Sequence, residues 1–307
     1  MVAETVFIVN PASSNGRTRR RWPRDELIFR RILGERTDFR MTERPGHATE
    51  LTKAAVQAGA TTVVAVGGDG TLNEVANGFL DGTGRSWNPT ARLAIFPVGT
   101  GADFVKTFPV PRDAVETAKR IVVGETRTID VGLCEFVDPG VPRARYFVNV
   151  AEFGSGGAVV DRVNRTTKIL GGRMSFLIAI LRTLPRYENT LVSYEADGSA
   201  SREVRMNDFV VANGRYFGAG LKPAPFADVS DGLLDVVIFG DIDFKTARRN
   251  LPALREGEHL SIDEVTHFRC RELRVTSTEE MIDLDGEFVG RHPTRFSVIP
   301  GVLPIIA

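Results

Sequence analysis

Three glycine-rich turns are the first features of this sequence that could do chemistry. They read NPASSNGR at residues 10–17, GGDGT at 67–71 and GTG at 99–101, and each follows a short apolar run. Glycine lets backbone N–H groups approach a ligand closely, and a helix that starts after such a turn adds unpaired amides. If the apolar runs are parallel strands, all three turns lie at the carboxyl edge of one sheet, where open α/β folds bind ligands. The pattern favours phosphate binding, although neither a Walker A loop nor a GxGxxG fingerprint is present.

Asp69, inside GGDGT, would place a carboxylate beside the expected phosphates. A magnesium ion between the carboxylate and the phosphates would remove the repulsion, because Mg²⁺ takes oxygen ligands from both. Alternatively, Asp69 accepts hydrogen bonds from neighbouring amides, or from a ribose or acceptor hydroxyl. The sequence leaves these roles open.

The first part of the chain has the elements that could position these turns. Runs rich in Val, Ile and Phe predict buried parallel strands at 5–9, 61–66 and 93–98. Segments of helical character lie between and after these strands, at 25–33, 48–58, 72–79 and 113–122. Alternating strands and helices predict α/β layers around a parallel sheet.

From residue 128 the pattern changes to short strands joined by turns, which predicts an antiparallel β-sandwich. A single helical stretch at 172–184 interrupts the strands. We therefore expect two domains, 1–127 and 128–294. The strand-like runs of the second half are 130–136, 146–150, 191–196, 208–211, 234–239, 268–276 and 288 onward.

Composition narrows the class of protein. Lys plus Arg and Asp plus Glu each total 39 in 307 residues, so the formal net charge is zero and nucleic acid is not an expected partner. No apolar stretch reaches the roughly 20 residues of a membrane-spanning helix. Cys134 and Cys270 are far apart and outside any CxxC pattern, which favours buried thiols over a redox or metal role. A cytoplasmic location is expected.

A series of motifs resembles the diacylglycerol kinase catalytic family, which includes bacterial lipid kinases and is similar to sphingosine and ceramide kinases. The most specific is VVAVGGDGTLNEVANGF at 63–79, and FPVGTGADF at 96–104 resembles a motif usually written PxGTxNDF. The related NAD kinases share GGDGT or a variant, but the later blocks favour lipid kinases. Those blocks are FVNVAEFGSGG at 147–157, VVANGRYFGAG at 210–220, SDGLLDV at 230–236 and LDGE at 284–287.

The resemblance implies an ATP-dependent kinase that phosphorylates a lipid hydroxyl, such as that of diacylglycerol, in phospholipid biosynthesis. It implies an ATP-binding α/β domain, a lipid-binding β-sandwich domain, an ATP cleft between them, and a final segment, 295–307, that returns to the first domain. ATP and Mg²⁺ are the expected cofactors, and the lipid is met at a membrane surface. Peripheral contact at the inner face of the membrane and a homodimer are both compatible with the sequence.

The resemblance also assigns roles to carboxylates. It makes Glu287 the general base on the lipid hydroxyl, with Asp285 orienting or assisting it and Asp69 as a third catalytic residue. Spacing alone favours a hairpin turn at Asp285–Gly286, as it does at Asp197–Gly198. Asp231 and Asp235 are the expected ligands of a structural magnesium site, with turn and strand-end residues as the alternative.

The expected nucleotide contacts lie in the glycine-rich turns and the segments that follow them. Glu74 could reach the ribose or face solvent, and Asp103 could line the cleft or cap a local turn. The complete set is Asn10, Gly67, Gly68, Gly70, Thr71, Glu74, Gly99, Thr100, Gly101 and Asp103.

Two departures from the family pattern keep other functions open. Ala102 stands where the family usually has Asn, and Gly157 stands where many members have Asp. The alternatives are an NAD kinase-like enzyme with a soluble acceptor, and a non-catalytic nucleotide or lipid sensor.

Overall fold

The computed structural model describes residues 4–98, 102–165, 179, 182–218, 220–276 and 279–307. The chain folds into two compact units. The first contains Met1–Asp130 and Gly301–Ala307, and the second contains Val131–Pro300.

The first unit is built on a parallel sheet in the order β2-β1-β3-β4. The strands are β1 (Thr5–Val9), β2 (Thr37–Met41), β3 (Thr62–Gly67) and β4 (Arg92–Pro97). The end of β16 (Pro293–Ile306) joins this sheet, since Ile305 pairs in parallel with Leu93 of β4. Strands β1 and β3 are buried along their whole length, which explains their almost continuously apolar sequences.

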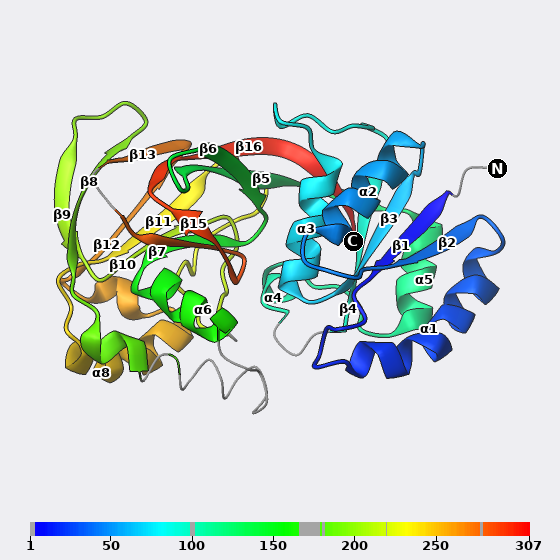
Figure 1. Ribbon diagram of the computed structural model, residues 1–307, viewed down its shortest axis with the longest axis horizontal. Coiled ribbons are helices and arrows are strands. Elements are labelled where there is room, and N and C mark those ends of the chain that lie inside the picture. The colour runs from blue at the N-terminus through cyan, green and yellow to red at the C-terminus, as the bar shows by residue number, and fades with distance from the viewer. Residues whose placement is uncertain (1–3, 99–101, 166–178, 180–181, 219, 277–278) are drawn as a thin grey trace. The chain divides into compact units, whose positions relative to one another are not determined.

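Helices cover both faces of this sheet, with α1 and α5 on one side and α2 and α3 on the other (Figure 1). Aromatic residues dominate the core under α1 and α5, where Phe29 lies 4.5 Å from Phe7 and 5.3 Å from Phe96 between ring centroids. The helices are α1 (Arg17–Leu33), α2 (His47–Gln57), α3 (Asp69–Phe79), the short α4 (Phe104–Thr107) and α5 (Ala114–Val123).

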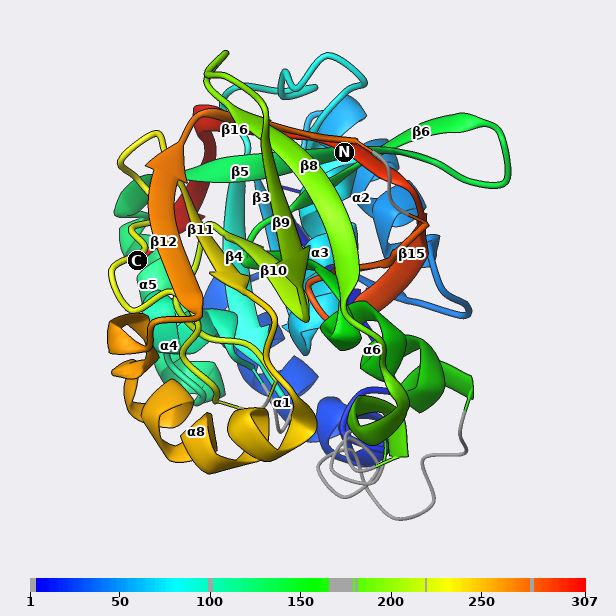
Figure 2. The same ribbon diagram turned by 90° about the vertical axis from the view of Figure 1, so that its left-hand side faces the viewer.

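The second unit is a sandwich of antiparallel strands. Among the described residues, six strands form one sheet in the order β12-β11-β10-β7-β14-β15. Strands β12, β11 and β10 lie side by side in Figure 2. The facing layer contains β16-β13-β8-β9, with β5 paired to β16 and β6. The strands are β5 (Thr126–Val137), β6 (Pro142–Phe147), β7 (Val150–Gly154), β8 (Thr190–Ala196), β9 (Arg202–Met206), β10 (Asp208–Ala212), β11 (Leu234–Phe239), β12 (Val265–Cys270), β13 (Glu272–Thr276), β14 (Met281–Leu284) and β15 (Glu287–Arg291).

The apolar core between the two layers includes Phe153, Phe209 and Phe296, all fully buried. Cys134 and Cys270 lie in the same core as free thiols, so the prediction of buried cysteines is confirmed. Burial raises the pKa of the Cys270 thiol to about 12, which makes it unreactive. The helical elements that can be bounded among the described residues of this unit are α6 (Ser155–Arg165), η2 (Leu184–Arg186), α8 (Phe244–Glu256) and η3 (His259–Ser261).

The predicted fold class is confirmed, while several elements differ from expectation. Helix α1 begins at Arg17, not near Asp25, because Pro23 is accommodated inside it. Helix α8 was not expected, although Phe244, Ala247, Leu251 and Leu254 follow helical spacing, and none of its residues is fully buried. Most of the helix expected at 172–184 lies outside the described residues. Within the described part of the chain, none of the helices combines the length and apolar character that a membrane crossing requires.

Gly132 on β5 offers a test of how tightly the sandwich packs. It pairs with Phe147, and a Cβ at this position would overlap the Phe147 ring. We expect Gly132→Ala to lower the free energy of unfolding in urea by about 1–3 kcal/mol, the usual cost of overpacking. The matched control is Gly82→Ala, because a Cβ there meets nothing within 4 Å. Equal stability of the two variants would contradict this prediction.

Candidate functional site

The structure brings the turn after β1 next to the turn after β3. Asn10 Nδ2 donates to Thr71 Oγ1 at 3.0 Å, and Asn10 N donates to Val66 O at 3.0 Å. The side-chain oxygen Oδ1 of Asn10 also accepts from Ala12 N at 3.0 Å, which shapes its own turn. Two of the three glycine-rich turns therefore meet at the carboxyl edge of the sheet.

The GGDGT segment turns directly from β3 into α3. A Cβ on Gly67 would overlap the side chain of Thr71, so glycine is required for this close approach. Gly68 is extended, and Gly70 and Thr71 lie in the first turn of the helix. Because Gly68 has no side chain, the residue before the helix does not cap the first-turn amides, which remain suited to an anion.

Asp69 uses its carboxylate on backbone amides of the next turn. Oδ2 accepts from Asp103 N at 2.9 Å and Oδ1 accepts from Phe104 N at 3.2 Å. These bonds hold the start of α4 against the start of α3. Loss of solvation raises the pKa of Asp69 above its ordinary value, although both amides act in the opposite direction.

Glu74 is buried and caps α2. Its two carboxylate oxygens accept from Gly46 N at 2.8 Å and from Ala48 N at 3.0 Å. Asp103 is also buried and forms an ion pair with Lys106 at 2.6 Å, one turn further along. Gly99, Thr100 and Gly101, which were expected to contact the nucleotide, lie outside the described residues.

In the second unit, Asp285 and Gly286 form the two-residue turn between β14 and β15. Both have positive φ, 54° and 88°, and Leu284 pairs with Glu287 across the turn. The buried Asp285 carboxylate accepts from the backbone N–H groups of Val148, Asn149 and Val150, each at 2.9 Å. Asp285 therefore fixes the junction between β6 and β7.

The Asp197–Gly198 turn has the same residue pair and allows a comparison with Asp285–Gly286. Asp197 is exposed, and its Oδ1 accepts from Arg271 N and Glu272 N at 2.9 Å each. Both aspartates thus hold a neighbouring strand, but only Asp285 does so in the interior.

Glu287 follows directly as the first residue of β15. Its Oε2 pairs with Arg145 Nη2 at 2.7 Å, and its side chain is 34% exposed. Unlike that of Asp285, this side chain is partly accessible to solvent.

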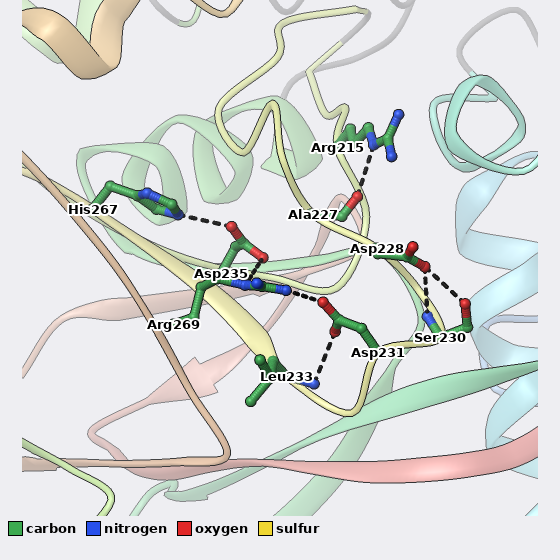
Figure 3. Close-up of polar contacts among 9 residues, drawn as sticks. All are labelled: Arg215, Ala227, Asp228, Ser230, Asp231, Leu233, Asp235, His267 and Arg269. Atoms are coloured by element: carbon green, nitrogen blue, oxygen red, sulfur yellow. Dashed lines mark hydrogen bonds and ion pairs between the residues drawn. The ribbon is translucent and has the colours of Figure 1, made fainter.

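Asp231 and Asp235 lie together in the second unit but do not fit a metal ion as arranged. Arg269 lies between them and pairs with both carboxylates (Figure 3). Asp231 also accepts from Leu233 N, and Asp235 also pairs with His267. In the part of the chain that the structure describes, no group of three or more His, Cys, Asp or Glu could hold a metal ion.

Comparison with known proteins settles the family. Residues 4–134 match the diacylglycerol kinase catalytic domain, and residues 149–307 match the YegS C-terminal NAD kinase beta sandwich-like domain. A diacylglycerol kinase of Mycobacterium tuberculosis (strain ATCC 25618 / H37Rv) is 33% identical over 262 residues, or 84% of this chain and 81% of that protein. The chain belongs to the diacylglycerol kinase family.

Further sequences and solved structures are also similar to this chain. A diacylglycerol kinase of Bacillus subtilis (strain 168) is 29% identical over 266 residues, covering 86% of this chain and 83% of that protein. The crystal structure of a diacylglycerol kinase from Bacillus anthracis superimposes with a TM-score of 0.69 at 20% identity, over 99% of this chain and 96% of that one. An NAD kinase from Archaeoglobus fulgidus in complex with ATP has a TM-score of 0.53 at 15% identity, over 98% of this chain and 92% of that one. The last two similarities concern the fold alone.

The two departures from the family pattern have structural consequences. Ala102 adopts a left-handed conformation with φ 44°, which Asn tolerates better than Ala. A Cβ on Gly157 would overlap the carbonyl of Met281, so the approach of α6 to β14 leaves no room for a side chain. Gly157 therefore cannot be exchanged for a larger residue without moving the helix.

Sequence reasoning missed a group of buried carboxyls beside the Asp285 turn. Glu152 on β7 and Asp283 on β14 are register partners, and Asp208 on β10 accepts from Gly156 N at 3.1 Å. All three are buried. The signal in the sequence was a single carboxyl in each of three otherwise mostly apolar strands.

Burial is the main cause of the shifted ionisation of these carboxyls. It raises the pKa of Asp208 to about 7 and that of Asp283 to about 8. Glu152 has its pKa raised well above the ordinary value, first by burial and then by repulsion from Asp208 and Asp283. Near pH 7 we therefore expect Glu152 and Asp283 to be mostly neutral in the folded protein and Asp208 to be partly ionised.

This arrangement predicts a pH-dependent stability. Between about pH 4 and about pH 8 the unfolded carboxyl of Asp283 is ionised while the folded one keeps its proton, so the free energy of unfolding falls as the pH rises. Asn is neutral at every pH. We therefore expect Asp283→Asn to gain stability relative to wild type from about pH 5 to about pH 8, measured by urea unfolding.

The exposed Asp263 supplies the control, since Asp263→Asn should follow the wild-type pH profile. A constant difference between Asp283→Asn and wild type across this range would show that Asp283 does not hold a proton in the fold.

Proposed function

We propose that this chain transfers the γ-phosphoryl group of ATP to a hydroxyl of diacylglycerol. The observation that carries the proposal is the partly exposed Glu287 carboxylate beside a rigidly held turn. Relatives named diacylglycerol kinase support the choice of acceptor. The first-turn amides of α3 support the choice of a phosphate-bearing donor.

On the nucleotide side, ATP binds as its magnesium complex and its phosphates lie against the GGDGT turn. The first-turn amides of α3 and the Asn10–Thr71 pair hold the phosphates in place. Asp69 and Glu74 act as positioning residues, because their carboxylates hold α4 and α2 by backbone hydrogen bonds. Gly99, Thr100 and Gly101 stay in the proposal as further nucleotide contacts.

On the acceptor side, Glu287 takes the proton of the lipid hydroxyl as its oxygen attacks the γ-phosphorus. The bond from the γ-phosphorus to the bridging oxygen breaks, and ADP leaves with that electron pair. Arg145 orients the Glu287 carboxylate between turnovers through their ion pair. Asp285 keeps the turn that carries Glu287 fixed to the β6–β7 junction.

The kinase assay tests this directly. We expect Glu287→Gln to lower transfer of label from radioactive ATP to diacylglycerol in mixed micelles by about 10²- to 10⁴-fold, the contribution of a positioned base. The matched control is Glu256→Gln at the exposed end of α8, which should keep wild-type activity. Unchanged transfer by Glu287→Gln would remove Glu287 from the mechanism.

The positioning role of Asp285 is expected to affect stability. Asparagine would point an NH₂ group at one of three buried backbone N–H donors, so we expect Asp285→Asn to lose about 1–3 kcal/mol of unfolding free energy. Glu287→Gln, with a partly exposed side chain, should unfold close to wild type. If Asp285→Asn unfolds like wild type in the same urea titration, the three hydrogen bonds do not hold this junction.

The same assay distinguishes the lipid kinase from the two alternatives, a kinase of a soluble acceptor and a non-catalytic sensor. Label in NAD without lipid would favour a soluble acceptor, in line with the fold shared with an NAD kinase. ATP binding without transfer to any acceptor, unaffected by Glu287→Gln, would favour a sensor.

A further inference from the structure

The segment that links Asp228 to β11 is held to β12 by a charge network around the buried Asp235 (Figure 3). Asp235 and Arg269 are register partners on β11 and β12, and His267 lies two residues away on the same face of β12. His267 Nε2 is 2.7 Å from Asp235 Oδ1, and Arg269 Nε is 3.5 Å from Asp235 Oδ2. The guanidinium also pairs with Asp231, which precedes the strand. One arginine therefore connects a carboxylate of the linking segment, Asp231, with one of β11, Asp235.

Every carboxylate oxygen of this pair already has a partner. Asp231 Oδ1 accepts from Leu233 N at 3.0 Å, while its Oδ2 contacts Arg269. Asp235 divides its oxygens between His267 and Arg269. A magnesium ion requires several oxygens at about 2.0–2.1 Å in octahedral geometry, so an ion that bridged the two carboxylates would compete with the guanidinium for their oxygens.

Burial makes a positive charge necessary at this point. The Asp235 side chain is 1% exposed, and an unpaired carboxylate in such a position is strongly destabilising. The planar guanidinium, with several donors in a fixed fork, can serve two carboxylates at once. Arg269 is itself 42% exposed, so its desolvation is only partial.

We propose that Arg269 is the cation that holds the 230–235 segment to the sheet, in the place where the family resemblance implies a divalent metal ion. Folding of the second unit then needs no bound Mg²⁺. This assignment is independent of the phosphoryl-transfer chemistry, because it concerns stability in the absence of nucleotide.

Thermal unfolding of the full-length chain, treated with EDTA and free of nucleotide, tests the proposal. Adding MgCl₂ is expected to leave the wild-type Tm unchanged. Arg269→Met removes the charge but keeps an apolar stem, and we expect a Tm lower by several degrees. The matched control is Arg271→Met, whose exposed side chain lies two residues away, and it should unfold like wild type. In Arg269→Met, saturating Mg²⁺ should recover about 2–4 °C, because the two carboxylates can then bind the ion.

Three outcomes would overturn the proposal. One is a wild-type Tm that rises with Mg²⁺ and stops rising in Asp231→Asn. Another is an Arg269→Met variant that unfolds like Arg271→Met. A third is a destabilised Arg269→Met that Mg²⁺ does not rescue, since the ion and the guanidinium would then not share the same oxygens. If Arg269→Met does not fold, the wild-type titration and Arg269→Lys, which keeps one charge, still decide the question.

Discussion

Three backbone N–H groups that converge on the buried carboxylate of Asp285 are the interaction on which the proposed acceptor site depends. Val148 and Asn149 lie where the chain passes from β6 in one sheet to β7 in the other, and Val150 is the first residue of β7. A buried N–H without an acceptor is costly, and a single carboxylate can satisfy several at once. The positive φ of Asp285 and Gly286 aims that carboxylate inward and, in the same turn, begins the strand that carries Glu287. The position of Glu287 thus follows from a requirement of folding.

The same requirement explains the carboxylates of the first unit. Asp69 and Glu74 lie in the segment that most specifically marks the family, yet their oxygens hold the starts of α4 and α2. Helix starts have unpaired amides, and a carboxylate is a favourable partner for them. The glycine-rich turn can therefore offer its own amides to a ligand while its carboxylates position the neighbouring helices.

The fold class could be predicted because it rests on local sequence patterns. These are apolar runs of strand length, helical segments between them, and the change near residue 128 to short strands joined by turns. The side-chain partners could not, because they depend on tertiary contacts. Glu74 accepts from Gly46, which is 28 residues away in the sequence, and Asp285 accepts from Val148, which is 137 residues away. At such separations, the spacing of residues does not indicate which of them are in contact. The buried carboxyls of Glu152 and Asp283 were missed for a similar reason, since only strand register places them opposite each other. The assignment of Glu287, Asp285 and the nucleotide contacts remains a prediction for the assays.

The hydrogen-bond partners of each carboxylate also distinguish the residues that position the backbone from the residue proposed to accept a proton. Asp69, Glu74 and Asp285 bind backbone amides, and releasing them would leave buried donors unpaired. Glu287 instead pairs with the side chain of Arg145, which is 28% exposed and can move without disturbing the backbone. A group that must accept a proton in each turnover has to change partners at low cost. Among the carboxylates that the family motifs identify in the two units, Glu287 combines accessibility with a partner that can be exchanged, which is the physical reason for placing the proton transfer there.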